Sequence, residues 1–74
     1  MNVTIRLFAA LRQFGPDEQA AAFPDGTTID DVVRALHIPG TIRLLRIVNG
    51  EHRPVDYVLK DGDELALFPP IAGG

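Results

Sequence analysis

The sequence predicts an α+β domain in which a sheet of four to five strands packs on one main helix. Three stretches of the chain carry this prediction. Residues 3–8 alternate apolar and polar side chains, residues 29–36 place apolar side chains at helical spacing, and residues 64–68 alternate again. At 74 residues the chain has room for a single hydrophobic core, so we expect one domain over residues 1–68 and a tail over residues 69–74.

The first half of the chain predicts a wide hairpin. Residues 3–8 should form a strand with one buried face, because their odd-numbered side chains are all aliphatic. Residues 10–14 then follow helical spacing until Gly15-Pro16 ends the turn. Residues 18–23 have the length of a second strand, although their alanines make it a weak one. A Pro-Asp-Gly-Thr turn at residues 24–27 closes this part of the chain.

The main helix is predicted to begin after Thr28. Thr28 can cap its N-terminus, and Asp31 at the third helical position gives a variant of the capping box. From Ile29 onward, apolar side chains recur at i, i+3, i+4 and i+7, which makes one stripe that must pack on the sheet. Pro39-Gly40 ends the helix.

The second half of the chain predicts three more strands. Residues 42–48 form the first of them, and Asn49-Gly50 is a strong turn signal after it. A short segment at residues 55–59 precedes a second turn at residues 61–63. In the last strand, residues 64–68, the side chains divide into an inward set (Leu65 and Leu67) and an outward set (Glu64, Ala66 and Phe68).

Composition narrows the classes of function. The chain has 7 Lys and Arg against 10 Asp and Glu, and its basic residues form no cluster of the kind that nucleic-acid phosphates need. No run of about 18 apolar residues could span a membrane, and the N-terminal residues enter a strand directly. The absence of cysteine excludes disulfides, thiolate metal sites and a cysteine nucleophile. We expect a cytoplasmic protein that binds neither nucleic acid nor membrane.

Side chains suited to catalysis are few. His37 and His52 are 15 positions apart, without the spacing of metal ligands, and are more simply explained as surface or helix-end histidines. Asp61 and Asp63 flank a glycine as in a calcium loop, but the other oxygen ligands of an EF-hand are missing, so turn chemistry is the better interpretation. The glycines form neither a dinucleotide-binding nor a phosphate-binding loop. We therefore expect no metal site, no bound cofactor and no catalysis by the chain alone.

The C-terminal residues 68–74 read Phe-Pro-Pro-Ile-Ala-Gly-Gly. The two prolines restrict the backbone to extended geometry, so we expect residues 69–74 to leave the fold as a flexible arm. The last three residues have almost no side chain, which lets a narrow active site close around the carboxylate of Gly74. The alternative is a frayed terminus without function.

This ending resembles a known family signature. Residues 61–74, Asp-Gly-Asp-Glu-Leu-Ala-Leu-Phe-Pro-Pro-Ile-Ala-Gly-Gly, are similar to the end of the small sulfur-carrier subunit of molybdopterin synthase, in the MoaD/ThiS family of ubiquitin-like proteins. Residues 7–12, 28–31 and 48–51 resemble the first-strand end, helix start and mid-chain turn of that family. The resemblance covers the whole chain and implies a β-grasp fold, a mixed sheet wrapped around one main helix.

The resemblance also implies a function. A ubiquitin-activating-like adenylyltransferase uses ATP to adenylate the C-terminus, and a sulfur donor converts the adenylate to a thiocarboxylate. The sulfur then passes to the large catalytic subunit of molybdopterin synthase or to another sulfur-accepting enzyme. The implied roles are Gly74 as the reactive end, Gly73, Ala72, Pro70 and Pro69 as the access segment, and Phe68, Phe8 and Ile71 as partner contacts. The chain would be a co-substrate subunit of a sulfurtransferase complex.

Three other functions compete with this hypothesis. The Pro-Pro pair favours molybdopterin synthesis over the thiazole pathway, but a carrier for thiazole, cysteine or another sulfur-containing metabolite uses the same chemistry. A ubiquitin-like protein modifier would use the same adenylated diglycine and attach it to lysines of target proteins. An interaction module with an inert tail would function without Gly73 and Gly74.

Overall fold

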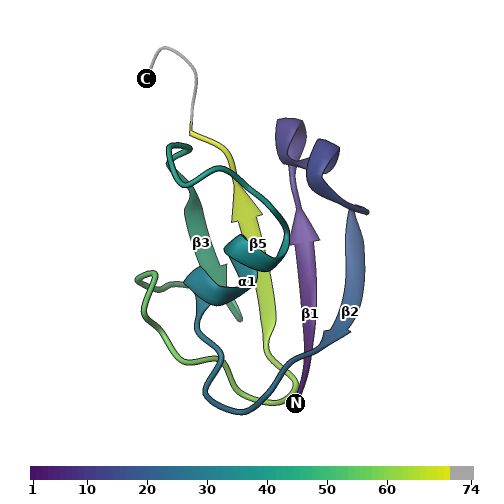
Figure 1. Cartoon of the computed structure of the whole chain (residues 1–74), viewed down its shortest axis with the longest axis vertical. Helices are drawn as coiled ribbons and strands as arrows, with labels where there is room; N and C mark the ends of the chain where they lie inside the picture. Colours follow the sequence, from purple (N-terminus) through teal and green to yellow (C-terminus); the bar gives the residue numbers. More distant parts are fainter. Residues whose placement is uncertain (71–74) are drawn as a thin grey trace.

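The structure is a computed structural model that describes residues 1–70. Its elements in chain order are β1 (Asn2–Leu7), the 3-10 helix η1 (Ala9–Phe14), β2 (Glu18–Ala22), α1 (Ile29–Ala35), β3 (Leu45–Val48), β4 (Glu51–His52) and β5 (Glu64–Phe68). Within residues 1–70 the strands form one five-stranded sheet in the order β2-β1-β5-β3-β4, with α1 on one face (Figure 1). This arrangement confirms the predicted α+β class.

The centre of the sheet is a parallel pair made from the first and last strands. β1 and β5 run parallel, with Ile5 opposite Leu65 and Leu7 opposite Leu67. The β1–β2, β3–β5 and β3–β4 pairs are antiparallel, so the sheet is mixed. Because two parallel strands end at the same edge of a sheet, the residues after β1 lie beside the residues after β5.

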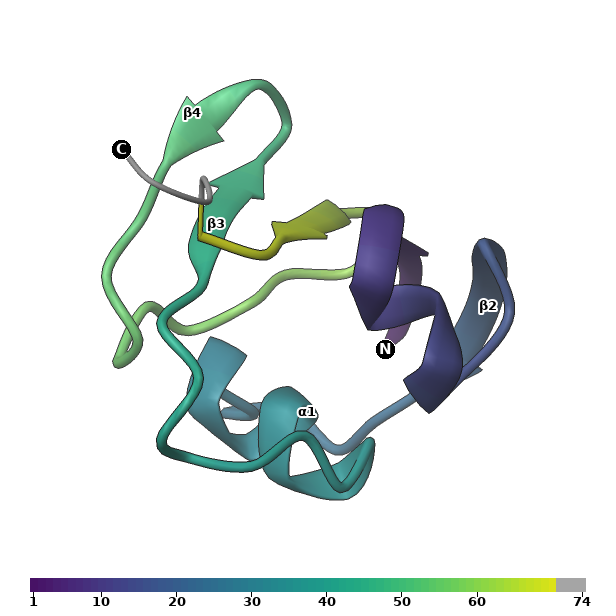
Figure 2. The same ribbon diagram turned by 90° about the horizontal axis from the view of Figure 1, so that it is seen from above.

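Helix α1 begins with the predicted capping box. The Thr28 hydroxyl accepts a hydrogen bond from the Asp31 amide (3.2 Å), and the Asp31 carboxylate accepts one from the Thr28 amide (3.0 Å). The Thr28 amide and side chain, together with the Arg34 guanidinium, hold the pKa of Asp31 below its ordinary value of 3.8. Figure 2 shows α1 lying across one side of the sheet. Within residues 1–70, no helix has the length and apolarity that crossing a membrane requires.

The core lies between α1 and the inner face of the sheet. Alternate residues of β1 and β5 supply many of its side chains, as the alternation in the sequence predicts. The buried cluster consists of Val3, Ile5, Leu7, Leu11, Ile29, Val32, Val33, Ile38, Val48, Leu59, Leu65 and Leu67. Ala66 lies on the opposite face as expected, yet it is only 9% exposed, because Arg6 and Ile47 flank it in the neighbouring strands.

The start of β3 differs from the prediction. β3 begins at Leu45 rather than at Ile42, since its partner β5 ends at Phe68, directly opposite Leu45. The two residues after Phe68 are prolines, which lack the N–H groups needed to extend the ladder. Ile42 instead donates its amide to the Pro39 carbonyl in a turn (3.1 Å).

The fifth strand is also not where the sequence indicated. It is β4, directly after the Asn49-Gly50 turn, where Ile47 pairs with His52. Residues 55–59 contain only an isolated bridge between Val58 and Thr28, within the part of the chain that the structure describes. The Tyr57 amide donates to the Pro54 carbonyl in a turn (3.0 Å). The carbonyls of Val55 and Tyr57 accept hydrogen bonds from the first amides of α1, those of Asp30 (2.9 Å) and Ile29 (3.1 Å), so this segment bonds to the helix start and forms no strand.

A buried carboxylate joins two turns at the start of β5. Asp63 is 6% exposed and accepts hydrogen bonds from the Asn49 side-chain amide (2.8 Å) and the Lys60 main-chain amide (2.8 Å). The Asn49 side-chain oxygen in turn accepts a hydrogen bond from the Glu64 amide (2.9 Å). Asn49 has a positive φ of 50°, which asparagine tolerates better than most residues. These bonds attach the β3–β4 turn to the turn that leads into β5.

Candidate functional site

The parallel β1–β5 pair brings two aromatic residues together at the base of the tail. Phe8 directly follows β1, and its amide donates to the Leu67 carbonyl at 3.2 Å. Phe68 is the last residue of β5. The two rings stack, with centroids 4.2 Å apart and planes 11° from parallel. Both side chains are half-buried, which matches the exposure expected from the sequence.

Arg6 lies beside this aromatic pair. Its guanidinium carbon is 5.6 Å from the centroid of the Phe8 ring, within the range of a cation–π contact. Its nitrogens also lie 3.4 Å from a carboxylate oxygen of Glu18 and 3.6 Å from one of Glu64. Since these side chains are about half exposed, the ion pairs contribute little stability. Their effect is to hold the guanidinium against the ring.

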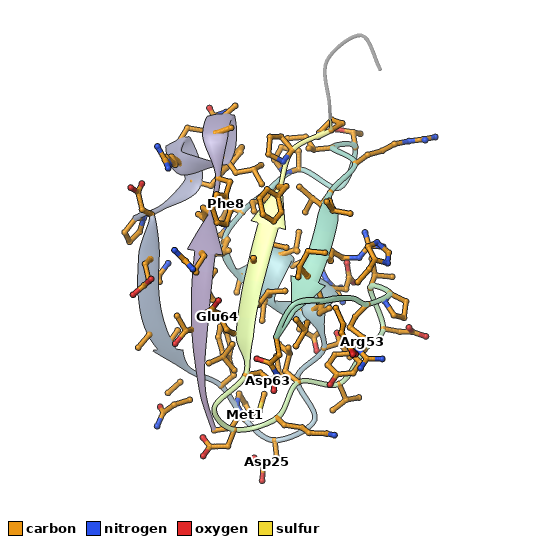
Figure 3. All side chains as sticks on the ribbon, turned by 180° about the vertical axis from the view of Figure 1, so that it is seen from behind. Met1, Phe8, Asp25, Arg53, Asp63 and Glu64 are labelled. Atoms are coloured by element: carbon orange, nitrogen blue, oxygen red, sulfur yellow. The ribbon has the colours of Figure 1, made fainter. Side chains whose placement is uncertain are left out.

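The aromatic pair continues into an apolar surface on the side of the sheet away from α1. Leu45 of β3 is opposite Phe68 and is 46% exposed, and Ile47 is opposite Ala66. We call Phe8, Leu45, Ile47, Ala66 and Phe68 together the outer-face platform. Figure 3 shows this side of the sheet, with Phe8 at the end where β5 leads into the tail.

Sequence reasoning identified Phe8 and Phe68 but missed the contribution of β3. The alternation of Leu45 and Ile47 with Arg46 and Val48 was a usable signal that the first two share a face. The register that places them beside β5 has no local sequence signal, because it depends on pairing between distant segments.

The structure describes only the first part of the predicted arm. Pro69 is half-buried and Pro70 is exposed. The predicted access residues Ala72 and Gly73, the predicted partner contact Ile71 and the predicted reactive residue Gly74 lie outside the described residues. The flexible arm over residues 69–74 and the roles of these residues therefore stay predictions.

The other residues considered as candidates have local structural contacts. His37 follows α1 with a positive φ of 61°, and His52 lies on β4. Asp61 accepts a hydrogen bond from the Asn2 amide (2.7 Å), and Asp63 joins the two turns described above. Among residues 1–70, no three His, Cys, Asp or Glu side chains are grouped so that they could hold a metal ion.

Comparison with known proteins identifies the family. Residues 5–74 match the ThiS family. The chain belongs to this family. It is 34% identical to a molybdopterin synthase sulfur carrier subunit from Chlamydomonas reinhardtii, and the match covers all of both chains.

Among the solved structures that resemble this ThiS-family chain are those of two proteins. The small archaeal modifier protein SAMP1 from Haloferax volcanii is 30% identical, with a TM-score of 0.76 and full coverage of both chains. A protein assigned as molybdopterin converting factor subunit 1 from Pyrococcus furiosus is 26% identical, also with a TM-score of 0.76, over 95% of this chain and 98% of that one. These likenesses confirm the MoaD/ThiS resemblance and the ubiquitin-like β-grasp fold.

Proposed function

We propose that this ThiS-family chain is a sulfur carrier whose C-terminal Gly74 is adenylated and thiocarboxylated, and which then donates sulfur in molybdopterin biosynthesis. The extent of the family match carries the proposal, because the match continues to residue 74 and so includes the diglycine. The Chlamydomonas relative, a molybdopterin synthase sulfur carrier subunit, supports the same pathway.

The chemistry follows from the properties of a C-terminal carboxylate. The carboxylate of Gly74 is ionised at neutral pH and is a poor electrophile. A partner adenylyltransferase joins it to the AMP part of ATP and releases pyrophosphate, which gives the carbonyl a leaving group. A sulfur donor then displaces AMP and leaves a thiocarboxylate. When that sulfur forms its bond to the acceptor, water supplies the oxygen that restores the carboxylate.

The base of the tail supports this role. The Phe8–Phe68 stack fixes the last residue of β5 just before Pro69-Pro70, so the direction in which the chain leaves the sheet is set by packing. A reactive group attached to a defined point reaches a partner's active site at a higher effective concentration than free sulfide would. Small residues at positions 72–74 let a narrow channel admit the end of the chain.

The outer-face platform is the surface we assign to partner docking. It contains an aromatic pair and an exposed leucine on one face, which is typical of binding anchors. Phe8 and Phe68 would contact both the adenylyltransferase and the large subunit that receives sulfur, and Ile71 would extend the contact along the tail. The partners supply the catalytic side chains and the ATP, and the carrier is their co-substrate.

The intact mass of the untagged protein from its native host tests the proposal. Replacement of one oxygen by sulfur adds about 16 Da, and hydrolysis should remove the increase. The matched control is the chain without Gly73 and Gly74, expressed in the same host, which should show no such increase. If the wild-type chain carries no sulfur in cells that are making molybdenum cofactor, the proposal is wrong.

A protein modifier is the second candidate, favoured by the likeness to SAMP1. If modifiers were linked to one another, the link would form on an amine of this chain. The single lysine, Lys60, is exposed, whereas the N-terminal ammonium donates a hydrogen bond to the Phe23 carbonyl at 2.8 Å, so Lys60 is the more accessible amine. A modifier would appear in the same mass experiment as higher-mass conjugates that leave a Gly-Gly remnant on lysines of target proteins. Carriers for thiazole or cysteine differ only in the acceptor, which labelled sulfur would identify.

A further inference from the structure

A groove of about 360 Å³ lies on the helix side of the sheet, away from the outer-face platform. Its walls come from α1, from residues 39–44, which connect α1 to β3, from β3 itself and from Val55. The aliphatic part of the lining is Val33, Ile42, Leu44 and Val55. A groove of this volume is in the range of sites that bind small ligands or a few side chains of a peptide.

Arg46 gives this groove a fixed positive charge. Its Nε donates to the Arg53 carbonyl at 3.1 Å, and its Nη1 donates to the Leu44 carbonyl at 3.0 Å. The guanidinium is therefore held by two main-chain oxygens, and neither bond uses Nη2. Within residues 1–70, no carboxylate forms an ion pair with Arg46. A half-buried cation that forms no ion pair favours an anionic occupant.

The other charged residues of the lining increase this preference. Arg43, which also lines the groove, is exposed and carries a second guanidinium. Asp30 is the one acidic residue of the lining, and its carboxylate is paired with Arg34 at 2.9 Å. The groove thus has a local excess of positive charge on a chain whose net charge is −3. Such a local reversal of sign selects partners with complementary charge.

The groove lies at the same end of the molecule as the base of the tail. Leu44 in its lining is followed by Leu45, which pairs with Phe68 at the base of the tail. Figure 1 shows the connection between α1 and β3 at the same end of the molecule as the exit of the chain from β5. An enzyme that takes up the tail must cover this end, and so it can reach the groove as well as the outer-face platform.

From these observations we infer that the groove is a second docking site, for an acidic segment of the adenylyltransferase that activates the tail. An aspartate or glutamate of the partner would pair with the guanidinium groups of Arg46 and Arg43. An aliphatic side chain next to that acidic residue would pack on Val33 and Val55. This inference rests on the proposed function for the identity of the partner, but the groove's preference for an acidic peptide does not depend on it.

A purely structural role for Arg46 makes a different prediction. An inward-pointing arginine near a sheet edge discourages pairing with the strands of other chains. The two hydrogen bonds of Arg46, to the carbonyls of Arg53 and Leu44, also link the segments on either side of β3. In that case substitution of Arg46 would lower stability, and substitution of Arg43 would change neither stability nor peptide binding. The groove would bind an acidic peptide and a neutral one equally well.

Amide NMR spectra of the labelled full chain separate these two roles. The probes are acetyl-Leu-Asp-Leu-amide and its neutral analogue acetyl-Leu-Asn-Leu-amide. We expect the acidic peptide to shift the amides of Val33, Ile42, Arg43 and Val55 with a millimolar dissociation constant, and the neutral peptide to bind at least about threefold more weakly. Arg43→Gln should remove this difference while the spectrum remains that of a folded chain. Arg46→Gln should do the same if it folds.

Arg12→Gln is the matched control, since Arg12 is an exposed arginine of η1 paired with Asp17. This variant should keep the preference for the acidic peptide. Equal shifts with both peptides, or shifts centred on Arg12, would overturn the proposal. The proposal would also be overturned if the chemical shifts of the groove amides changed when the peptide-free protein was diluted, because this would show that a second copy of the chain occupies the groove.

A second measurement tests the identity of the partner. Arg43→Glu should slow thiocarboxylate formation by the host's activating enzyme about tenfold, a difference of about 1.4 kcal/mol, whereas Arg12→Glu should leave it unchanged. Equal rates for the two variants would refute docking of that enzyme in the groove. If wild-type chain is never thiocarboxylated, the proposed function fails, and the peptide titration still decides whether the groove binds an acidic segment.

Discussion

Phe8 contributes to two different contacts at the base of the tail. Its ring stacks on the Phe68 ring, with centroids 4.2 Å apart, and its ring centroid is 5.6 Å from the guanidinium carbon of Arg6. Both contacts lie within the chain, so Phe8 has a positioning role even before any partner binds. The same residue is also part of the outer-face platform, so the proposed docking would give it a second role.

Phe8→Ala should affect both stability and partner binding. Removing the ring loses the aromatic pair and part of the apolar burial, which should lower the free energy of unfolding by about 1–2 kcal/mol. The affinity for the activating enzyme should fall at least about tenfold. Urea denaturation and a binding titration measure the two effects. Phe14→Ala is the control, because Phe14 is half-buried on η1 and should affect stability without the same loss of affinity.

Gly74→Ala should spare folding and impair activation. Among residues 1–70 the buried cluster lies between residues 3 and 67, and on the predicted arm a methyl group at position 74 should leave the melting temperature unchanged. In a channel shaped for glycine, the added Cβ should slow adenylation at least about tenfold. ATP–pyrophosphate exchange catalysed by the activating enzyme measures this rate. A variant that is adenylated at the normal rate would rule out the steric argument.

At the level of single elements, the α1 capping box gives a prediction about pH. The folded pKa of Asp31 lies below its ordinary value of 3.8, so its charge stabilises the fold fully above that value. This contribution is lost as the pH falls below 3.8 through the folded pKa. Asp31→Asn keeps an acceptor for the Thr28 amide but cannot be charged. Its melting temperature should therefore be lower than that of the wild type at neutral pH and should converge with it in acid.

Melting curves of both proteins across this pH range make the measurement. Asp56→Asn, at an exposed position outside the helix, is the control and should show no such convergence. A gap between wild type and Asp31→Asn that stays constant into strong acid would mean that the charge of Asp31 is not what stabilises the helix start.

The link between the two turns before β5 gives a prediction about stability. Asp63→Asn would place a side-chain N–H group against one of two donors, which are the side-chain amide of Asn49 and the main-chain amide of Lys60. A buried unsatisfied donor costs about 1–3 kcal/mol, and denaturant unfolding should show a loss of that size. Asp56→Asn serves again as the exposed control and should change stability by less than about 0.5 kcal/mol.

The elements differ in how well the sequence predicts them, for a physical reason. Helix α1 was predicted from its cap to its apolar stripe, because both signals come from residues within a few positions of one another. The start of β3 depends on where β5 ends, and residues 55–59 form no strand because the carbonyls of Val55 and Tyr57 bond to the start of α1. Likewise, Phe8 and Phe68 could be identified as exposed aromatics, but their stacking depends on the parallel pairing of distant strands.

At the scale of the whole molecule, the position of the N-terminus relative to the end of β5 gives a prediction about tags. The N-terminus lies at the end of the sheet opposite the exit of the tail (Figure 1). The N-terminal ammonium bonds to the Phe23 carbonyl, and a main-chain amide in its place can donate the same bond. An N-terminal tag should therefore leave thiocarboxylation intact, whereas a C-terminal tag should abolish it. Intact mass measurement of both tagged proteins tests this, and loss of the sulfur adduct with the N-terminal tag would contradict the expected geometry.

The central position of β5 has a consequence for how the protein is made. Among the described strands, the ribosome delivers β1 and β2 first, and β5, which lies between β1 and β3, last. Until β5 emerges, β3 has no partner that connects it to the early hairpin, so the sheet cannot close during translation. The predicted tail, with its diglycine, follows directly on the strand that completes the sheet. On the proposed function, a chain in which β5 has not yet paired would lack the Phe8–Phe68 stack, and the activating enzyme would mainly meet tails that leave a completed sheet.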